Sequence, residues 1–182
     1  SLGQALLVRY SHQLGAADRR AVQDTFGMVV RVVPWVGCLA TLGTWLTSRL
    51  FVDLIYRHGA FDAGMAEGVA GLVDVYALQF PVYWTSAAAF TLVSAASLNR
   101  MFLPIGVVLF AVNLASDFLL VNTVGLAGIA LTTTIVYGVS WTLLNLALRN
   151  AGMVSLRITD FLAAARPFAL LALAWPVVRG LG

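Results

Sequence analysis

The chain has 182 residues, of which 60% are hydrophobic and 10% are charged, whereas soluble domains have about a quarter of their residues charged. With a mean hydropathy of +0.90, too few polar residues remain to cover a soluble surface, so the solvent for much of the chain must be lipid. All 11 basic residues are Arg, which excludes a P-loop and Schiff-base chemistry because both need Lys.

Cysteine, histidine and charge exclude further classes of site. Cys38 is the single Cys, and together with two distant His residues it is too little for a structural zinc site. The common catalytic motifs of hydrolases, metalloproteases and dinucleotide-binding enzymes are missing from the sequence. The formal charge of +3 is explained by Arg beside membrane spans. We therefore expect no enzyme, no metal, no cofactor and no nucleic-acid partner.

The start of the chain is apolar and is followed by a polar stretch. Residues 1–8 have no charged region or cleavage site before them, so they are read as the end of a spanning helix and not as a signal peptide. Residues 9–21 are predicted to form a cytoplasmic loop. We accordingly expect the chain to be part of a larger protein.

Long apolar segments occupy most of the remaining sequence. Each of the first four supplies the about 20 residues that a helix needs to cross a bilayer, and a fifth is shorter and contains Arg166 and two prolines. None has the alternation typical of a membrane β-barrel strand. The sequence predicts an all-α, polytopic helical membrane protein with about five transmembrane helices, at residues 22–50, 69–96, 101–121, 126–148 and 161–178.

The distribution of Arg predicts the orientation of these helices. Arg residues gather before residue 22, in the turn at 98–103 and in the connection at 149–160, whereas the connection at 51–68 has one Arg and three acidic residues. Arg-rich connections face the cytoplasm, and the two kinds alternate here with the predicted spans. We expect a multi-pass protein with the Arg-rich connections on the cytoplasmic side.

Arg31 is a candidate substrate-binding residue because it lies inside a predicted span. A charge at the centre of a membrane helix costs at least about 2.5–3.5 kcal/mol on insertion scales, so it needs a partner. A guanidinium can bind phosphate oxygens with two nitrogens, which suits a ligand that carries phosphate. The alternative is that the side chain extends to the cytoplasmic headgroups.

Asn113 and Asp117 are a second candidate pair, because residues four apart share one face of a helix. They could coordinate a cation or proton, or hydrogen-bond a sugar. They could instead hold their helix against its neighbour through the hydroxyls of Thr132, Thr133 and Thr134.

Two motifs are distinctive, namely Leu-Ile-Tyr-Arg-His-Gly-Ala-Phe at 54–61 and Val-Tyr-Ala-Leu at 75–78. They give the chain a resemblance to the MviN/MurJ family of lipid II flippases, which belongs to the multidrug/oligosaccharidyl-lipid/polysaccharide superfamily. The resemblance is supported by Ser11 with Gly-Ala-Ala-Asp at 15–18, and by Asn113 with Gly-Leu-Ala-Gly-Ile-Ala at 125–130. The resemblance covers roughly residues 2–150.

The resemblance implies a fold and a function. It implies most of the C-terminal lobe of a two-lobed transporter of the bacterial inner membrane, with the other lobe on the same polypeptide. It implies alternating access that moves an undecaprenyl-diphosphate-linked peptidoglycan precursor, lipid II, across the membrane. Membrane lipid and this lipid-linked glycan would be the partners, with a coupling ion or proton. The alternatives are a polysaccharide repeat-unit or multidrug exporter of the same superfamily, or a non-transporting membrane scaffold.

Overall fold

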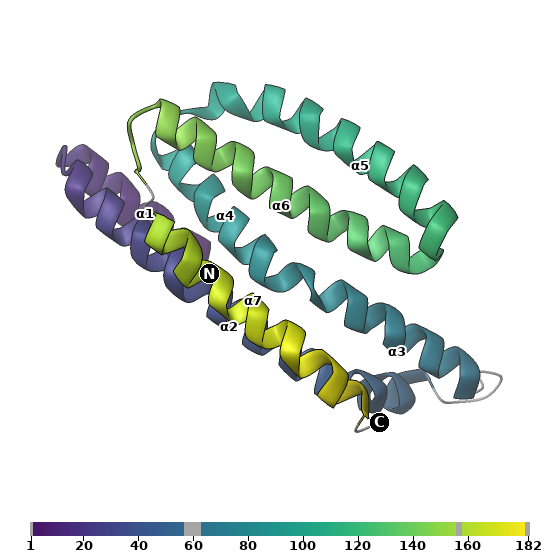
Figure 1. The fold of residues 1–182 in the computed structure, drawn as a ribbon. Helices are drawn as coiled ribbons and strands as arrows, with labels where there is room; N and C mark the ends of the chain where they lie inside the picture. Colours follow the sequence, from purple (N-terminus) through teal and green to yellow (C-terminus); the bar gives the residue numbers. More distant parts are fainter. Residues whose placement is uncertain (1, 57–62, 156–157, 181–182) are drawn as a thin grey trace.

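The computed structural model describes residues 2–56, 63–155 and 158–180, and over these residues the chain is helical, without strands. The prediction of an all-α protein is confirmed (Figure 1). The elements are α1 (Leu2–Gly15), α2 (Arg19–Tyr56), α3 (Ala63–Ala77), α4 (Gln79–Ala95), the 3-10 helix η1 (Asn99–Met101), α5 (Phe102–Val124), α6 (Leu126–Asn150) and α7 (Ile158–Gly180).

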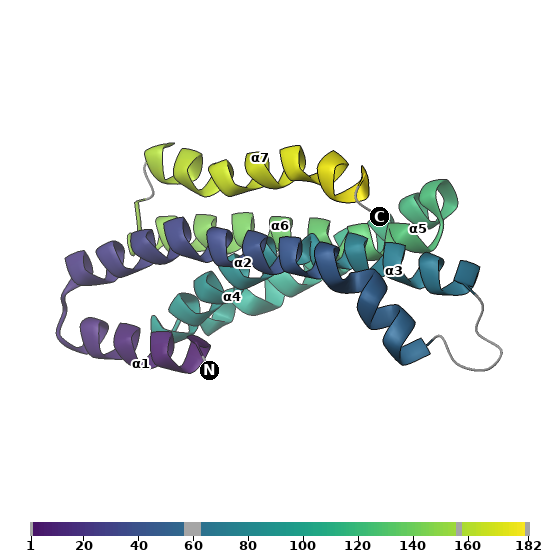
Figure 2. The same ribbon diagram turned by 90° about the horizontal axis from the view of Figure 1, so that it is seen from below.

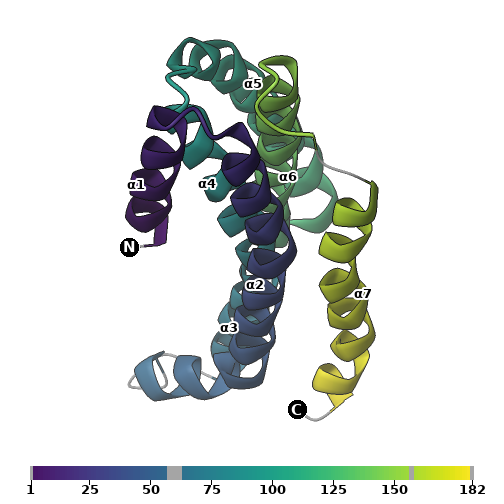
Figure 3. The same cartoon turned by 90° about the vertical axis from the view of Figure 1, so that its left-hand side faces the viewer.

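The long helix α2 lies at the centre of the arrangement. It packs against α3, α4 and α7, while α6 packs against α4 and carries α5 on its other side. Helix α1 packs mainly against α4. Figures 2 and 3 show α7 on the opposite side of α2 from α1, with α2 between the two.

Three of the described helices are long and apolar enough to cross a membrane by themselves, namely α2, η1 with α5, and α6. Helix α7 contains a shorter apolar helical stretch at Leu162–Val178. The apolar segment predicted at residues 69–96 falls on α3 and α4, which follow one another with a single intervening residue, Leu78. The three helices together with the α3–α4 pair and α7 correspond to the five predicted segments.

The polar stretch at residues 9–21, predicted as a loop, is helical except for the turn at residues 16–18. The reason is a stripe of apolar side chains four residues apart, at Leu6, Tyr10 and Leu14, which lies on one face of α1. Leu6 and Tyr10 are buried in the core cluster of the bundle, and Leu14 packs against it. The stretch is therefore mostly helical and not irregular, because tertiary packing of this stripe outweighs the polar residues between its members, and its cytoplasmic location stays a prediction.

The junction between α3 and α4 is an interruption inside the apolar interior. Pro81 has no N–H, so the carbonyl of Ala77 loses its usual intrahelical donor. Helix α2 supplies a replacement, because the hydroxyl of Thr41 donates to the Ala77 carbonyl at 2.7 Å. One turn further along α2, Nε1 of Trp45 donates to the carbonyl of Asp74 at 2.8 Å. In lipid each unpaired backbone group costs several kcal/mol, so these two donors allow the interruption to exist.

Helices α2 and α4 meet backbone to backbone beside this junction. A Cβ added to Gly37 would lie 2.3 Å from Cα of Pro81, closer than real Cβ contacts. Glycine at position 37 is therefore required for the close approach. Small residues on α4 serve the same purpose, since Ala88 and Ala89 are buried and Ser86 donates a hydrogen bond to Ser140 of α6 at 2.9 Å.

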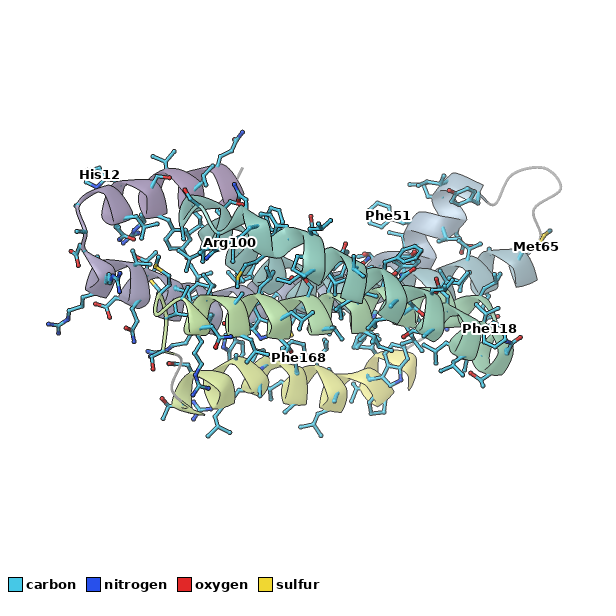
Figure 4. The ribbon with its side chains drawn as sticks, turned by 90° about the horizontal axis from the view of Figure 1, so that it is seen from above. His12, Phe51, Met65, Arg100, Phe118 and Phe168 are labelled. Atoms are coloured by element: carbon cyan, nitrogen blue, oxygen red, sulfur yellow. The ribbon has the colours of Figure 1, made fainter. Side chains whose placement is uncertain are left out.

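The connections that carry Arg lie at one end of the bundle. The α1–α2 turn, η1 and residues 151–155 after α6 share this end, and the α5–α6 turn lies at the other (Figure 1). In Figure 4, His12 and Arg100 lie toward the first end, and Phe118 and Met65 lie toward the second. The Arg-bearing connections that alternate with the others along the sequence thus lie together at one end of the bundle. Of the motif at residues 54–61, residues 54–56 form the last turn of α2, and residues 57–61 lie outside the described residues.

Candidate functional site

Arg31 of α2 is paired with a carboxylate from the far end of the chain. Its Nε and Nη2 atoms both donate to Oδ1 of Asp160, at 2.9 and 2.6 Å. The side chain of Asp160 is 7% exposed, against 57% for Arg31. Asp160 lies in the first turn of α7, where the positive end of the helix dipole favours a carboxylate. This ion pair therefore fixes the start of α7 on α2.

Asp160 was not among the residues predicted from the sequence, because 129 residues separate it from Arg31. A signal was available, since an Asp just before an apolar segment is typical of a helix start. The partner that Arg31 needs inside a membrane span is thus supplied by this chain's own carboxylate, and it is that carboxylate which is buried.

A cavity of about 430 Å³ opens beside the ion pair, and we call it the α2–α7 cavity. Nε2 of Gln23 donates to the carbonyl of Ser155 at 3.2 Å, which ties the first turns of α2 to the segment before α7. Two carboxylates and one guanidinium line this space, together with an amide and a hydroxyl. The lining residues are Gln23, Asp24, Gly27, Met28, Arg31, Val32, Ser155 and Asp160.

Asn113 and Asp117 lie on α5, away from Arg31. Both side chains are half-buried, although α5 has no fully buried residue. Oδ1 of Asp117 is buried and accepts no hydrogen bond within the described part of the chain. A buried carboxylate oxygen without a hydrogen-bond donor is costly, so this position calls for an explanation.

The packing of α5 on α6 indicates what faces Asp117. A Cβ on Gly128 would lie 2.5 Å from the backbone carbonyl of Leu120, so the two helices touch at this level. The helices run antiparallel (Figure 1), and therefore the turn before Leu120, with Asp117, lies level with the turn after Gly128, with Thr132. The hydroxyl of Thr132 is also buried without a hydrogen-bond partner among the described residues.

The neighbouring hydroxyls on α6 are already engaged. Thr133 and Thr134 donate to the carbonyls of Ile129 and Ala130 in their own helix, at 3.2 and 3.5 Å. Over the described residues no group of three or more His, Cys, Asp or Glu residues is arranged to hold a metal ion. What the α5–α6 interface offers is one carboxylate and nearby neutral oxygen atoms.

The structure does not bring the three candidate residues into one site. Arg31 belongs to the α2–α7 interface, whereas Asn113 and Asp117 belong to the α5–α6 interface on the far side of α6 from α2. The two places differ in chemistry as well as position. The first holds an ion pair beside a cavity, and the second holds a buried carboxylate oxygen.

Comparison with known proteins identifies the family. The family model described as "Lipid II flippase MurJ" matches residues 1–181, which is nearly the whole chain. The chain belongs to the MurJ family. This confirms the resemblance that was drawn from the motifs, and because the MurJ family is one of transporters it agrees with the expectation that the chain is not an enzyme.

A solved structure supports the MurJ fold. The chain superposes on "Lipid II flippase MurJ, inward closed conformation" with a TM-score of 0.72 and 18% sequence identity. The match covers 97% of this chain and 36% of that chain, so the chain spans about a third of the length of its solved relative. No curated protein sequence matches the chain.

Proposed function

We propose that this chain is the greater part of the C-terminal lobe of a lipid II flippase. In this proposal the full-length protein moves the undecaprenyl-diphosphate-linked peptidoglycan precursor across the bacterial inner membrane by alternating access. The other lobe lies on the same polypeptide, and the substrate site lies between the two lobes. No covalent bond is made or broken in this step.

The observation that carries the proposal is the match of the MurJ family model to residues 1–181. The fold adds support, since it agrees with a MurJ structure over 97% of the chain. The polysaccharide, multidrug and scaffold alternatives receive no comparable support from any observation on this chain.

We further propose how the helices lie in the membrane. Helix α2, the α3–α4 pair, α5, α6 and α7 each cross the bilayer, and the end of the bundle that carries the Arg-bearing connections faces the cytoplasm. The apolar surface of the bundle supports this placement, because large side chains such as Leu103, Phe110 and Phe118 on α5 are mostly exposed. Such a surface is suited to lipid or to the other lobe.

For Asn113 and Asp117 we propose a role in coupling transport to a proton or cation. The support is that the buried Oδ1 of Asp117 and the hydroxyl of Thr132, at the same level, have no hydrogen-bond partner among the residues that the structure describes. In the full-length protein, Asp117→Asn should reduce transport and weaken its dependence on the ion gradient. Asn122→Ala is the matched control, because Asn122 is an exposed residue of α5 whose amide donates to the Phe118 carbonyl of its own helix at 2.6 Å, and it should leave both unchanged.

The ion pair with Asp160 bears on whether Arg31 binds a phosphate of the substrate. A diphosphate arriving at Arg31 would also meet the carboxylates of Asp24 and Asp160 in the α2–α7 cavity. Two carboxylates repel a strongly anionic group more than one paired guanidinium attracts it. We therefore propose that Arg31 acts at the α2–α7 interface and not as a grip on the lipid II diphosphate.

The experiment that tests the flippase proposal uses the full-length protein in lipid vesicles. Fluorescent lipid II is placed in the inner leaflet, and its arrival outside is followed with a membrane-impermeant quencher. The proposal expects arrival well above that of empty vesicles, and movement of an organic cation or a polysaccharide repeat unit in place of lipid II would contradict it. The isolated residues 1–182 serve as a control and should not transport, because the site between lobes is then incomplete.

A further inference from the structure

The α2–α7 cavity has a volume of about 430 Å³, which lies in the range of small-molecule sites in proteins. Its charged side chains are one ion pair and one further carboxylate. Arg31 and Asp160 neutralise one another, since two guanidinium nitrogens share Oδ1 of Asp160. Asp24 is exposed and has no ion-pair partner within the described residues, so the cavity has a net charge of about −1 around a central guanidinium.

The position of these groups along α2 relates them to the membrane. Helix α2 has 38 residues, and its midpoint lies between Gly37 and Cys38. At a rise of 1.5 Å per residue, Arg31 lies about 10 Å from that midpoint and Asp24 about 20 Å. The hydrocarbon core extends about 15 Å from the bilayer centre. With α2 centred in the bilayer, Arg31 lies just inside the cytoplasmic boundary, and Asp24 lies among the headgroups.

A guanidinium at the boundary with a carboxylate further out is complementary to a zwitterionic lipid headgroup. In such a headgroup the phosphate lies deeper, next to the glycerol, and the ammonium lies further out. The phosphate would face the edge of Arg31 that is turned away from Asp160, and the ammonium would face Asp24. A primary ammonium donates hydrogen bonds to a carboxylate, whereas a quaternary choline group has no N–H to donate.

We propose that the α2–α7 cavity binds the headgroup of an amino-phospholipid, with the primary ammonium on Asp24 and the phosphate on Arg31. The inference rests on the membrane placement in the proposed function and not on the identity of the transported substrate. An anionic headgroup such as phosphatidylglycerol has no cation for Asp24 and would add a negative charge beside two carboxylates. The basic residues outside the cavity, including Arg19 and Arg20, attract anionic lipid to the general surface but are not part of its lining.

The test measures lipid binding to the purified full-length protein by native mass spectrometry, with phosphatidylethanolamine, phosphatidylglycerol and undecaprenyl diphosphate offered in turn. We expect phosphatidylethanolamine to bind in preference to phosphatidylglycerol. Asp24→Asn should reduce this preference roughly three- to fivefold, as expected for a solvent-exposed ion pair. Asp24→Glu should retain the preference. Glu67→Gln is the matched control, because it removes one exposed carboxylate at the other end of the bundle and should change nothing.

Three outcomes would overturn the inference. The first is binding of phosphatidylglycerol to the unmodified protein that is as tight as that of phosphatidylethanolamine, or tighter. The second is an unchanged preference in Asp24→Asn. The third is displacement of phosphatidylethanolamine by undecaprenyl diphosphate to the same extent from the unmodified protein and from Asp24→Asn. The last would assign the cavity to a diphosphate. Because the readout is lipid binding, a protein that fails to flip lipid II can still show the preference, so the two proposals fail separately.

Discussion

Replacing Thr41 with Val removes one hydroxyl from the interior and keeps the size and branching of the side chain. That hydroxyl donates to the Ala77 carbonyl, which Pro81 leaves without its usual donor. Thr41 is completely buried, so water cannot take the place of the lost donor. The substitution therefore leaves a buried backbone carbonyl unpaired at the interruption between α3 and α4.

The expected loss of unfolding free energy follows from two known ranges of hydrogen-bond energy. Leaving a buried polar group unpaired costs about 1–3 kcal/mol, whereas hydrogen bonds between membrane helices average about 0.6 and reach about 1.7 kcal/mol. Because the Ala77 carbonyl cannot return to an intrahelical donor, the upper part of the membrane range applies. We expect Thr41→Val to lower the free energy of unfolding of the full-length protein by about 1–2 kcal/mol.

The assay is equilibrium unfolding in mixed micelles with increasing sodium dodecyl sulfate, followed by circular dichroism. Thr47→Val is the control, because the Thr47 hydroxyl donates at 2.8 Å to the Gly43 carbonyl in its own helix and bridges nothing. If Thr41→Val fell within about 0.3 kcal/mol of Thr47→Val, which is the usual scatter between independent sites, the reasoning about the Ala77 carbonyl would be refuted.

Three further predictions concern packing, charge and topology. Gly37→Ala should cost about 1–3 kcal/mol of unfolding free energy, because its Cβ would lie 2.3 Å from Cα of Pro81 and the helices must separate, whereas Gly43→Ala has open space and should be neutral within error. Arg31→Met should cost more unfolding free energy than Asp160→Asn, by about 1–2 kcal/mol, because Arg31→Met takes the cation away from a buried carboxylate, whereas Asp160→Asn leaves a half-exposed guanidinium that water can reach. Equal costs would show that burial of Asp160 does not control this pair. In a Cys38→Ala background, Met65→Cys should react in intact cells with a membrane-impermeant maleimide and Asn99→Cys should not, and the reverse pattern would invert the proposed topology.

The helical class and the segregation of Arg could be predicted because they depend on local sequence. Apolar segments of about 20 residues predict membrane helices. The number of Arg residues in each connection is known from the sequence itself, and it predicts the orientation. The helical nature of residues 9–15 was also within reach, since Leu6, Tyr10 and Leu14 recur every four residues. It was missed because the polar residues between them were given more weight than this spacing.

The pairings that hold the bundle together could not be predicted in the same way. Pro81 indicated a freed carbonyl, but the donor that meets it is Thr41, which comes 36 residues earlier on another helix. Asp160 is further still from Arg31, and a single sequence contains no sign of such a pairing. These contacts depend on how helices are packed, and that information is distributed over the whole chain.

The contact of Gly37 with Pro81 has a consequence for movement between α2 and α4. Where side chains interdigitate, a change in crossing angle must lift each side chain out of its neighbours and pass through unfavourable rotamers. At Gly37 and Pro81 the two backbones meet with no Gly37 side chain between them, so a change in crossing angle needs no rotamer change at this point, whereas the packed side chains of the core cluster elsewhere along α2 and α4 oppose it. The hydrogen bonds from Thr41 and Trp45 lie about one and two turns further along α2, where the same rotation produces a larger displacement. These two hydrogen bonds therefore limit how far α2 and the α3–α4 junction can separate.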